Sequence, residues 1–184
     1  QNPISQVDAE SIEANETYQI DTLILATGFD AITGALTGLD IVGRNEINLK
    51  DQWKEGAKSY LGLGVSNFPN LFTITGPGSP SVLSNMMPSI EQHVNWIANC
   101  IGWMSENNKS VIESTETAEE EWMKLVNEIA DTTIFTSTKS WYNGSNIEGK
   151  AKSFLPFIGV PVYTEKLEEI TAADYQGFVF DKSN

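Results

Sequence analysis

Two segments of the chain carry hydrophobic residues at the spacing of an amphipathic α-helix. In the first, apolar positions recur every three or four residues: Ile90, Val94, Ile97, Ile101 and Met104. This spacing puts them on one face, so we expect a helix whose apolar side packs in the core. Pro88 suits its first turn, Ser84 or Asn85 can cap its start, and Asn107-Asn108 would end it.

The second helix is predicted to begin after Thr115, a residue type that caps helix N-termini. Glu116, Glu119 and Glu120 crowd its first turns, where the positive end of the helix dipole favours acidic side chains. Its expected buried face is formed by Trp122, Leu125, Val126 and Ile129. We interpret both apolar stripes as core positions.

Continuous apolar runs predict two strands buried on both faces. The first covers residues 21–26 and stops at Gly28, where the backbone can turn sharply or approach a ligand. The second covers residues 71–75 and stops at Gly76-Pro-Gly78.

Weaker patterns predict the remaining elements. Segments 41–42 and 47–49 flank a turn and favour a short antiparallel ribbon. The other predicted elements are a hairpin in residues 1–20, a loop over 136–153, closing strands at 154–159 and 175–180, and a short acidic helix at 165–173.

Composition places the chain in the globular class, with 184 residues, 40% of them hydrophobic and 10% aromatic. The net charge of −14 argues against binding nucleic acid or anionic membranes. No apolar run approaches the roughly 20 residues of a membrane span, and no signal peptide is evident. The single Cys100 cannot form an internal disulfide and is expected to be buried in its helix. The expected compartment is the cytoplasm.

Common catalytic motifs are missing from the sequence. Gly62-Leu-Gly64-Val-Ser-Asn67 has two glycines of a dinucleotide fingerprint, but it precedes a predicted strand instead of following one. There is no Walker loop, Cys/His metal cluster or nucleophile elbow, so no metal site is predicted. His93, the only histidine, lies one position off the apolar stripe, and we expect it to be partly exposed or hydrogen-bonded.

The strongest candidate for chemistry is the segment 76–91, where a predicted strand enters a Gly/Pro/Ser bend and then a capped helix. Such a turn aims unpaired backbone N–H groups and a positive dipole end at whatever precedes the helix. On spacing alone, a plain strand-to-helix turn without a ligand is the favoured interpretation.

The residues of this segment resemble the Baeyer–Villiger monooxygenases, especially those that act on aryl ketones. The shared motifs follow one order along the chain: Ala-Thr-Gly-Phe-Asp30, Gly76-Pro-Gly-Ser-Pro-Ser-Val-Leu-Ser-Asn-Met86, Pro88-Ser-Ile-Glu-Gln-His-Val-Asn-Trp96, Ala118-Glu-Glu-Glu-Trp122, Ser140-Trp-Tyr, Phe154-Leu-Pro-Phe-Ile-Gly159 and Tyr175-Gln-Gly-Phe178. Val160 and Thr164 depart from the family's usual residues, which puts in doubt the contacts of the last loop.

The resemblance implies an α/β fold: the C-terminal portion of a flavoprotein with two dinucleotide-binding domains. The sheet of its FAD domain would be incomplete, with a peripheral hairpin and two long helices. Residues 1–20 would end the NADP domain or a linker. Residues 21–184 would belong to the FAD-binding domain, with a helical subdomain at 115–135 and a mobile loop at 137–153.

The resemblance also implies an FAD- and NADPH-dependent reaction with O₂, in which a peroxyflavin inserts oxygen beside a ketone carbonyl to give an ester or lactone. Ser84, Asn85 and Met86 would meet the flavin, and Trp141 would fold over NADP. The substrate pocket would include Ser81, Val82 and Leu83. Lys150 could face a phosphate, but solvent is the expected environment.

The catalytic Arg and its Asp partner would lie upstream, in an N-terminal portion of the same polypeptide. By itself the chain is therefore expected to be inactive, to bind neither cofactor, and to expose an apolar patch or self-associate. Two alternatives stay open. One is a flavin-containing monooxygenase that oxygenates nitrogen or sulfur, and the other is a non-catalytic binding or interaction module.

Overall fold

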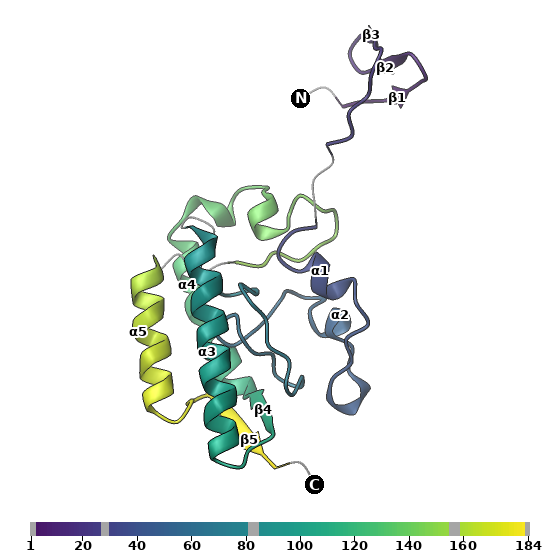
Figure 1. The fold of residues 1–184 in the computed structure, drawn as a ribbon. Helices are drawn as coiled ribbons and strands as arrows, with labels where there is room; N and C mark the ends of the chain where they lie inside the picture. The colour runs from purple at the N-terminus through teal and green to yellow at the C-terminus, as the bar shows by residue number, and fades with distance from the viewer. Residues whose placement is uncertain (1–2, 27–29, 81–84, 155–158, 183–184) are drawn as a thin grey trace.

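Three helices and a two-stranded sheet surround the larger hydrophobic core (Figure 1). The structure is a computed structural model that describes residues 3–26, 30–80, 85–154 and 159–182. The helices are α3 (Met86–Glu106), α4 (Glu116–Asp131) and α5 (Gly159–Ala172). Strand β4 (Val111–Ser114) pairs antiparallel with β5 (Phe178–Asp181). The predicted α/β class is confirmed, and both long predicted helices are present.

Aromatic side chains from the three helices, from β5 and from Tyr60 meet in the larger core. Trp96 of α3 lies 5.6 Å, between ring centroids, from Phe178 of β5, and Tyr60 lies 5.1 Å from the same ring. Trp122 of α4 packs near Tyr163 of α5. Tilted aromatic pairs of this kind add about 0.5–1.5 kcal/mol each beyond the area they bury. The core therefore ties the C-terminal strand to the three helices.

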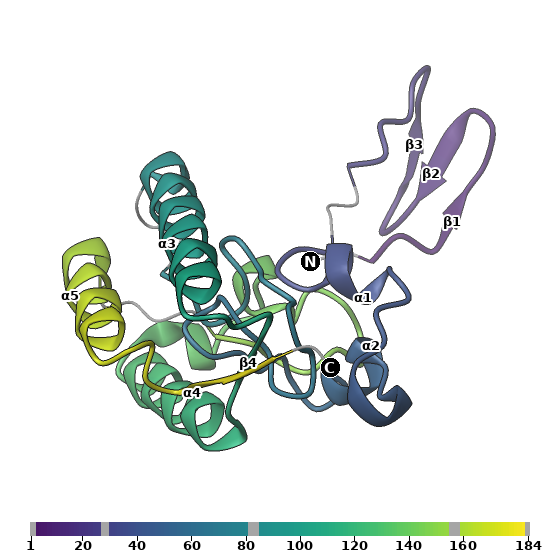
Figure 2. The ribbon, with the colours of Figure 1, turned by 60° about the horizontal axis from the view of Figure 1, so that its bottom comes forward.

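A second, smaller core lies beside α1 (Gly34–Thr37) and α2 (Leu49–Gln52), on the other side of the molecule from α4 and α5 (Figure 2). Its buried members are Leu49, Trp53, Ala57, Val65 and Phe68. The segment 60–68 joins the two cores, because Leu61 and Leu63 belong to the larger one and Val65 and Phe68 to the smaller. This segment contains Gly62 and Gly64, and the apolar residues between and after these glycines serve as core.

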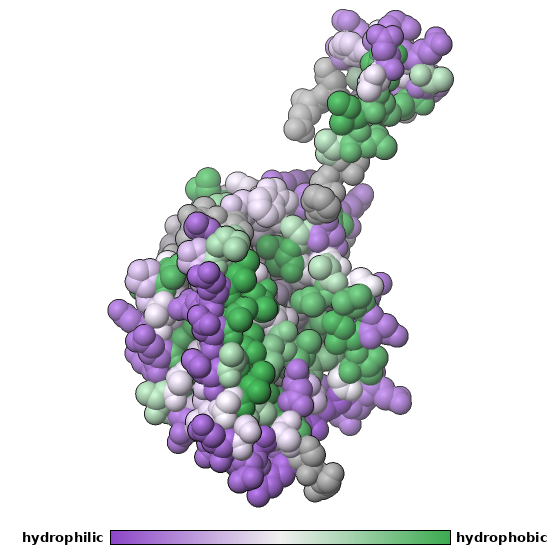
Figure 3. All heavy atoms as spheres, viewed as in Figure 1, coloured by the Kyte–Doolittle hydropathy of each residue, from purple (hydrophilic) through white to green (hydrophobic). Residues whose placement is uncertain are grey.

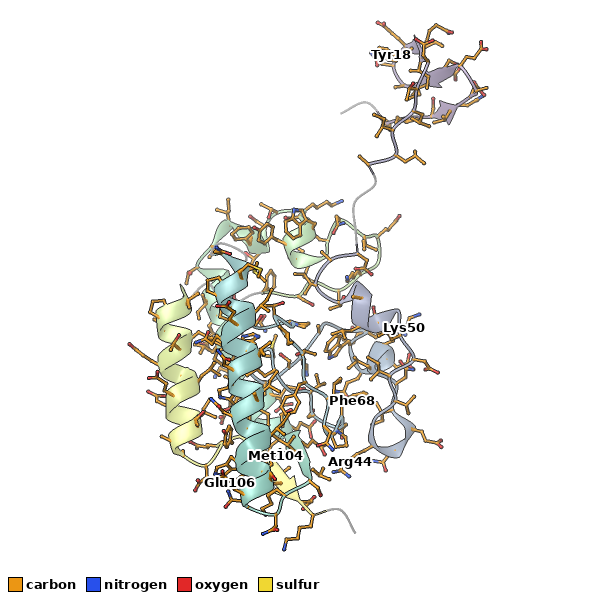
Figure 4. The ribbon with its side chains drawn as sticks, viewed as in Figure 1. Tyr18, Arg44, Lys50, Phe68, Met104 and Glu106 are labelled. Atoms are coloured by element: carbon orange, nitrogen blue, oxygen red, sulfur yellow. The ribbon has the colours of Figure 1, made fainter. Side chains whose placement is uncertain are left out.

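The N-terminal segment forms a three-stranded antiparallel meander that projects from the rest of the molecule (Figures 1 and 2). Its strands are β1 (Gln6–Val7), β2 (Ser11–Glu13) and β3 (Thr17–Gln19). Tyr18, labelled in Figure 4, is 48% exposed. The predicted hairpin is confirmed, with one strand more than a hairpin has.

Both predicted strands with continuous apolar runs are wrong as strands. Residues 21–26 form no strand and are exposed, with Ile24 at 82% and Leu25 at 76%. Gly28 lies outside the described residues. A strand of this kind pairs with strands at its edges and is covered by other elements on both faces. None of the described strands pairs with this segment, and its side chains are exposed. Residues 71–75 make only one bridge, between Phe72 and Gly64.

Helix α3 is confirmed at both ends, but its predicted buried face is only partly right: Met104 is buried and Ile97 packs against the core, whereas Val94 and Ile101 are exposed. Asn85 caps it by accepting a hydrogen bond from the Met87 N–H group, and Asn107 follows its last turn. Its buried residues are Ser89, His93, Trp96, Cys100 and Met104. Val94 and Ile101 of the predicted stripe are 44% and 52% exposed. The bulky Trp96 and the hydrogen-bonded His93 point inward, which rotates the apolar stripe toward the surface.

The later elements are partly as predicted. Thr115 caps α4 by accepting from the Ala118 N–H group. Trp122 and Val126 are buried as expected, but Leu125 is 40% exposed. Helix α5 begins at Gly159, earlier than expected, and β5 confirms the last strand. The predicted strand at 154–159 lies mostly outside the described residues. The ribbon at 41–49 is confirmed as a single Val42–Asn48 bridge.

The other short elements are 3₁₀ turns that connect these parts. They are η1 (Arg44–Glu46), η2 (Ile134–Thr136) and η3 (Trp141–Asn143). Arg44 and Phe68, labelled in Figure 4, lie near the ribbon. No helix in the described parts of the chain is long and apolar enough to cross a membrane.

Candidate functional site

The turn at residues 75–79 precedes α3 and is held by hydrogen bonds with α3, with α4 and with Ser59. The Thr75 N–H group donates to His93 Nδ1 of α3 at 2.9 Å. Trp122 Nε1 of α4 donates to the Gly78 carbonyl oxygen at 2.8 Å. The Ser59 hydroxyl donates to the Pro77 carbonyl oxygen. The turn is therefore fixed in place although it has no regular secondary structure.

Gly62 packs directly against this turn. A Cβ atom at Gly62 would lie 2.4 Å from the Ser79 Cβ, and the φ angle of Gly62 is +73°, which side chains rarely adopt. The Thr73 hydroxyl donates to the Gly62 carbonyl oxygen at 2.7 Å. The Gly62-Leu-Gly64 motif thus has a packing role against the turn.

The N-terminus of α3 is exposed and offers backbone donors. Asn85 Oδ1 accepts from the Met87 N–H group at 3.0 Å, and the Met87 side chain is 61% exposed. Ser89, in the first turns, is 1% exposed and its hydroxyl has no partner in the described part of the chain. Unpaired N–H groups and the helix dipole at such an end favour an anion or a carbonyl oxygen.

Only part of the predicted site can be located. Asn85 and Met86 lie at the start of α3. Ser81, Val82, Leu83 and Ser84 lie outside the described residues. The turn at 75–79 lies just before that segment and α3 just after it. The predicted bend is therefore confirmed at residues 75–79, and the predicted capped helix is confirmed from Asn85 onward.

Behind the turn, His93 and Tyr163 form a buried hydrogen-bonded pair. Tyr163 Oη donates to the Leu61 carbonyl oxygen at 2.6 Å and lies 3.0 Å from His93 Nε2. Because Nδ1 accepts from Thr75, the proton of the neutral ring is on Nε2, which donates to Tyr163 Oη. Burial lowers the pKa of His93 to about 4. It also raises the pKa of the Tyr163 hydroxyl, which stays protonated.

The sequence indicated only that His93 would be exposed or satisfied by hydrogen bonds. The second possibility is confirmed, since His93 is 0% exposed and both ring nitrogens are bonded. Its position off the apolar stripe, together with its being the only histidine, was the available signal. Nothing in the local pattern pointed to Tyr163, which lies 70 residues away along the chain.

Trp141 is presented at the surface by a loop with its own hydrogen-bond network. The indole is 47% exposed and stacks on Tyr142 with 4.1 Å between ring centroids. Asn143 is buried, and its Nδ2 donates to the carbonyl oxygens of Phe135 and Thr138 at 2.9 and 3.2 Å. Sequence reasoning missed Asn143. The loop thus exposes one large ring on an ordered base.

Lys150 connects the same loop to the segment after residues 27–29. Its Nζ forms an ion pair with the Asp30 carboxylate and donates to the Ala31 carbonyl oxygen at 3.2 Å. The Lys150 side chain is only 18% exposed. The expectation that Lys150 faces solvent is therefore wrong, because two acceptors on the neighbouring segment hold it. No metal-binding cluster occurs among the residues that the structure describes.

Comparison with known proteins gives relatives for nearly the whole chain, although no model of a protein family matches it. A phenazine N-monooxygenase of Lysobacter antibioticus is 40% identical over 182 residues, 97% of this chain and 33% of that protein. A Baeyer–Villiger monooxygenase of Pseudooceanicola batsensis is 36% identical over 185 residues, 99% of this chain and 34% of that protein. The crystal structure of cyclohexanone monooxygenase from Rhodococcus sp. Phi1 bound to NADP+ superposes with a TM-score of 0.93 at 37% identity, covering 99% of this chain and 34% of that one.

The chain is homologous to part of the Baeyer–Villiger monooxygenases. It spans about a third of the length of the relatives it matches, and it corresponds to the C-terminal part of the solved Baeyer–Villiger monooxygenase structures. The resemblance inferred from the motifs is thus confirmed. The two small sheets agree with the incomplete sheet expected of such a part.

Proposed function

We propose that the chain is the C-terminal part of an FAD- and NADPH-dependent monooxygenase that inserts one oxygen atom of O₂ next to a ketone carbonyl, giving an ester or lactone. The observation that carries this proposal is the superposition of 99% of the chain on cyclohexanone monooxygenase. That superposed part includes the clamped turn and the capped start of α3. When bound, the flavin supplies the activation of O₂, and NADPH supplies the electrons.

The start of α3 fits the flavin. Asn85 and Met86 would hold the ring through the N-terminal backbone donors, and Ser84 would complete this edge. The helix dipole there stabilises negative charge by about 0.3–1 kcal/mol, and by up to about 2 kcal/mol when partly buried. The exposed Met87 and the buried, unpartnered Ser89 hydroxyl support a further group at this end of the helix. Ser81, Val82 and Leu83 would shape the substrate pocket.

Trp141 is assigned to the nicotinamide cofactor. Its indole is half-exposed on a loop that Asn143 and Lys150 hold in shape. A large aromatic ring on such a loop can cover a bound nucleotide and exclude water from the site. We assign residues 1–20 to the end of the NADP domain or to linker strands, and residues 21–184 to the FAD domain, with its helical subdomain at 115–135 and its mobile loop at 137–153.

The rest of the polypeptide would cover the apolar face of α3. Figure 3 shows a hydrophobic stripe along this helix, and Met87, Val94 and Ile101 on it are 44–61% exposed. Contiguous exposed apolar surface marks an interaction site. The expected partners are thus the N-terminal FAD- and NADP-binding portion, a small ketone and O₂. The cytoplasm is the proposed compartment.

One experiment tests the proposal directly. The complete enzyme that contains this chain is purified and its visible absorption spectrum recorded. NADPH consumption and products are then followed with phenylacetone, with a tertiary amine, and without substrate. We expect a flavin band and conversion of the ketone to an ester. A flavin band with N-oxide as the only product would instead support nitrogen oxygenation, an alternative that the 40% identity to the phenazine N-monooxygenase favours. Absence of flavin and of turnover would support a non-catalytic module.

A further inference from the structure

His93 connects the turn at residues 75–79 to the helix that carries the proposed flavin contacts. It lies seven residues, about two helical turns, after Met86. Its Nδ1 accepts the Thr75 N–H group, the first donor of the turn. The imidazole thus fixes the distance between the turn at residues 75–79 and α3.

Tyr163 extends this connection to the other side of the turn. Its hydroxyl accepts from His93 Nε2 and donates to the Leu61 carbonyl oxygen. The next residue, Gly62, packs against Ser79 at the end of the turn. The His93–Tyr163 pair therefore contacts the turn directly at Thr75 and, through Leu61 and Gly62, at Ser79.

These contacts are buried and leave no freedom in the protonation pattern. His93 and Tyr163 are each 0% exposed. The Thr75 N–H group can donate only to an unprotonated Nδ1, and the Leu61 oxygen can only accept. With both neighbours fixed, the neutral ring with its proton on Nε2 is the one form that satisfies every partner. A buried ring with both nitrogens bonded defines one position of the turn.

We propose that His93 is a positioning residue for the flavin edge of the site, holding the turn at 75–79 in register with Asn85 and Met86 at the start of α3. Tyr163 orients the imidazole. This inference rests on the proposed function, because it assigns a purpose to contacts behind the proposed flavin-binding residues. No step of the reaction passes through His93, which acts on the site only through the turn and the helix.

The test uses two variants of the complete enzyme, each of which keeps a polar group near only one of the two ring nitrogens of His93. His93→Asn places an amide oxygen near the position of Nδ1 and keeps an acceptor for Thr75. His93→Gln reaches toward Tyr163 and leaves the Thr75 N–H group without its acceptor. Thr171→Val is the matched control. It removes the hydroxyl that accepts from Trp96 Nε1 at 3.0 Å, a partly buried bond between α3 and α5 that does not contact the turn.

Four measurements separate positioning from simple stability. They are the visible circular dichroism of the bound flavin, the ratio of ester to hydrogen peroxide formed per NADPH, hydrogen exchange of the Thr75 amide, and the melting temperature. In His93→Gln the ester-to-peroxide ratio falls about ten-fold, the flavin spectrum changes and the Thr75 amide loses protection, because a buried donor has lost its acceptor. His93→Asn restores all three to within about two-fold of the wild type.

Thr171→Val lowers the melting temperature but keeps the wild-type spectrum and ratio. If His93→Gln cannot be purified, Tyr163→Phe replaces it. The ester-to-peroxide ratio of that variant falls about three-fold through the lost bond to Leu61.

The inference is overturned if the ratio and spectrum stay at wild-type values in the His93→Gln or Tyr163→Phe protein. It is equally overturned if Thr171→Val changes them as much. A wild-type enzyme without flavin or ketone conversion would overturn the proposed function instead, and the Thr75 exchange would still report on the contact.

Discussion

The buried imidazole of His93 makes the stability of the fold depend on pH. Its pKa falls from 6.5 to about 4 because burial disfavours the charged ring. The unfolded chain therefore binds a proton at a higher pH than the folded one. This contribution to stability is complete above pH 6.5 and is lost as the pH falls toward 4. The full shift corresponds to about 3 kcal/mol.

Urea unfolding at pH 7, 5.5 and 4 checks this expectation, with His93→Asn as the comparison. The variant has no titrating ring, so its stability should fall less steeply over this range. Equal slopes for the two proteins would contradict the assignment of the pH dependence to His93.

Glu119 is a buried carboxylate that supports the segment joining the two cores. It is 3% exposed, and its oxygens accept from the Ser66 N–H group at 2.9 Å and the Ser66 hydroxyl at 3.2 Å. Burial raises its pKa. Glu119→Ala leaves a buried N–H group without an acceptor and should lower the free energy of unfolding by about 1–3 kcal/mol. Glu119→Gln keeps one acceptor and should lose much less, as urea unfolding at pH 7 would measure.

Lys150 is the point where the Trp141 loop is attached to another element. Lys150→Ala removes the ion pair with Asp30 and the bond to Ala31, yet a partly exposed pair contributes only up to about 1 kcal/mol. We expect almost unchanged global stability but faster proteolysis and hydrogen exchange across residues 144–150. Lys139→Ala is the control, because Lys139 is an exposed lysine of the same loop. Equal exchange in both variants would show that the ion pair does not order the loop.

At the scale of elements, α3 shows what a periodic pattern can and cannot predict. Asn85, Pro88 and Asn107 predicted its ends because capping and proline effects are local. Its buried face was predicted only in part, at Ile97 and Met104, because hydrophobic spacing says that a stripe exists but not what covers it. Here the core takes Ser89, His93 and Trp96, and the stripe with Val94 and Ile101 is exposed.

The same reason explains the strand predicted at residues 21–26. Its apolar run is typical of a sheet strand that other elements cover on both faces. None of the described strands pairs with this segment. In the candidate site, too, local features could be predicted and long-range contacts could not. Local patterns predicted the bend and the capped helix. The contacts of His93 with Tyr163 and of Lys150 with Asp30 join residues 70 and 120 positions apart, and no local pattern contains them.

At the scale of the whole molecule, the exposed stripe predicts how the isolated 184-residue chain behaves in solution. Met87, Val94 and Ile101 recur every seven residues of one helix, so that their exposed side chains lie on one face. Without the rest of the polypeptide, this apolar surface can be buried only against another copy. We expect the chain to self-associate, with a concentration-dependent sedimentation coefficient, and to show no ketone-stimulated NADPH oxidation.

Val94→Lys combined with Ile101→Lys should make the isolated chain monomeric while changing its own stability little, since surface substitutions usually lie within about 0.5 kcal/mol. The matched control is Val162→Lys with Val179→Lys, which charges two valines that are 51% and 49% exposed on α5 and β5. The control should still associate. In the complete enzyme we expect the α3 pair to disrupt assembly and flavin retention, because the N-terminal portion would cover the stripe there. The control pair should leave both unchanged. A chain that is monomeric without substitution, or a complete enzyme that tolerates both lysines on α3, would place the interface elsewhere.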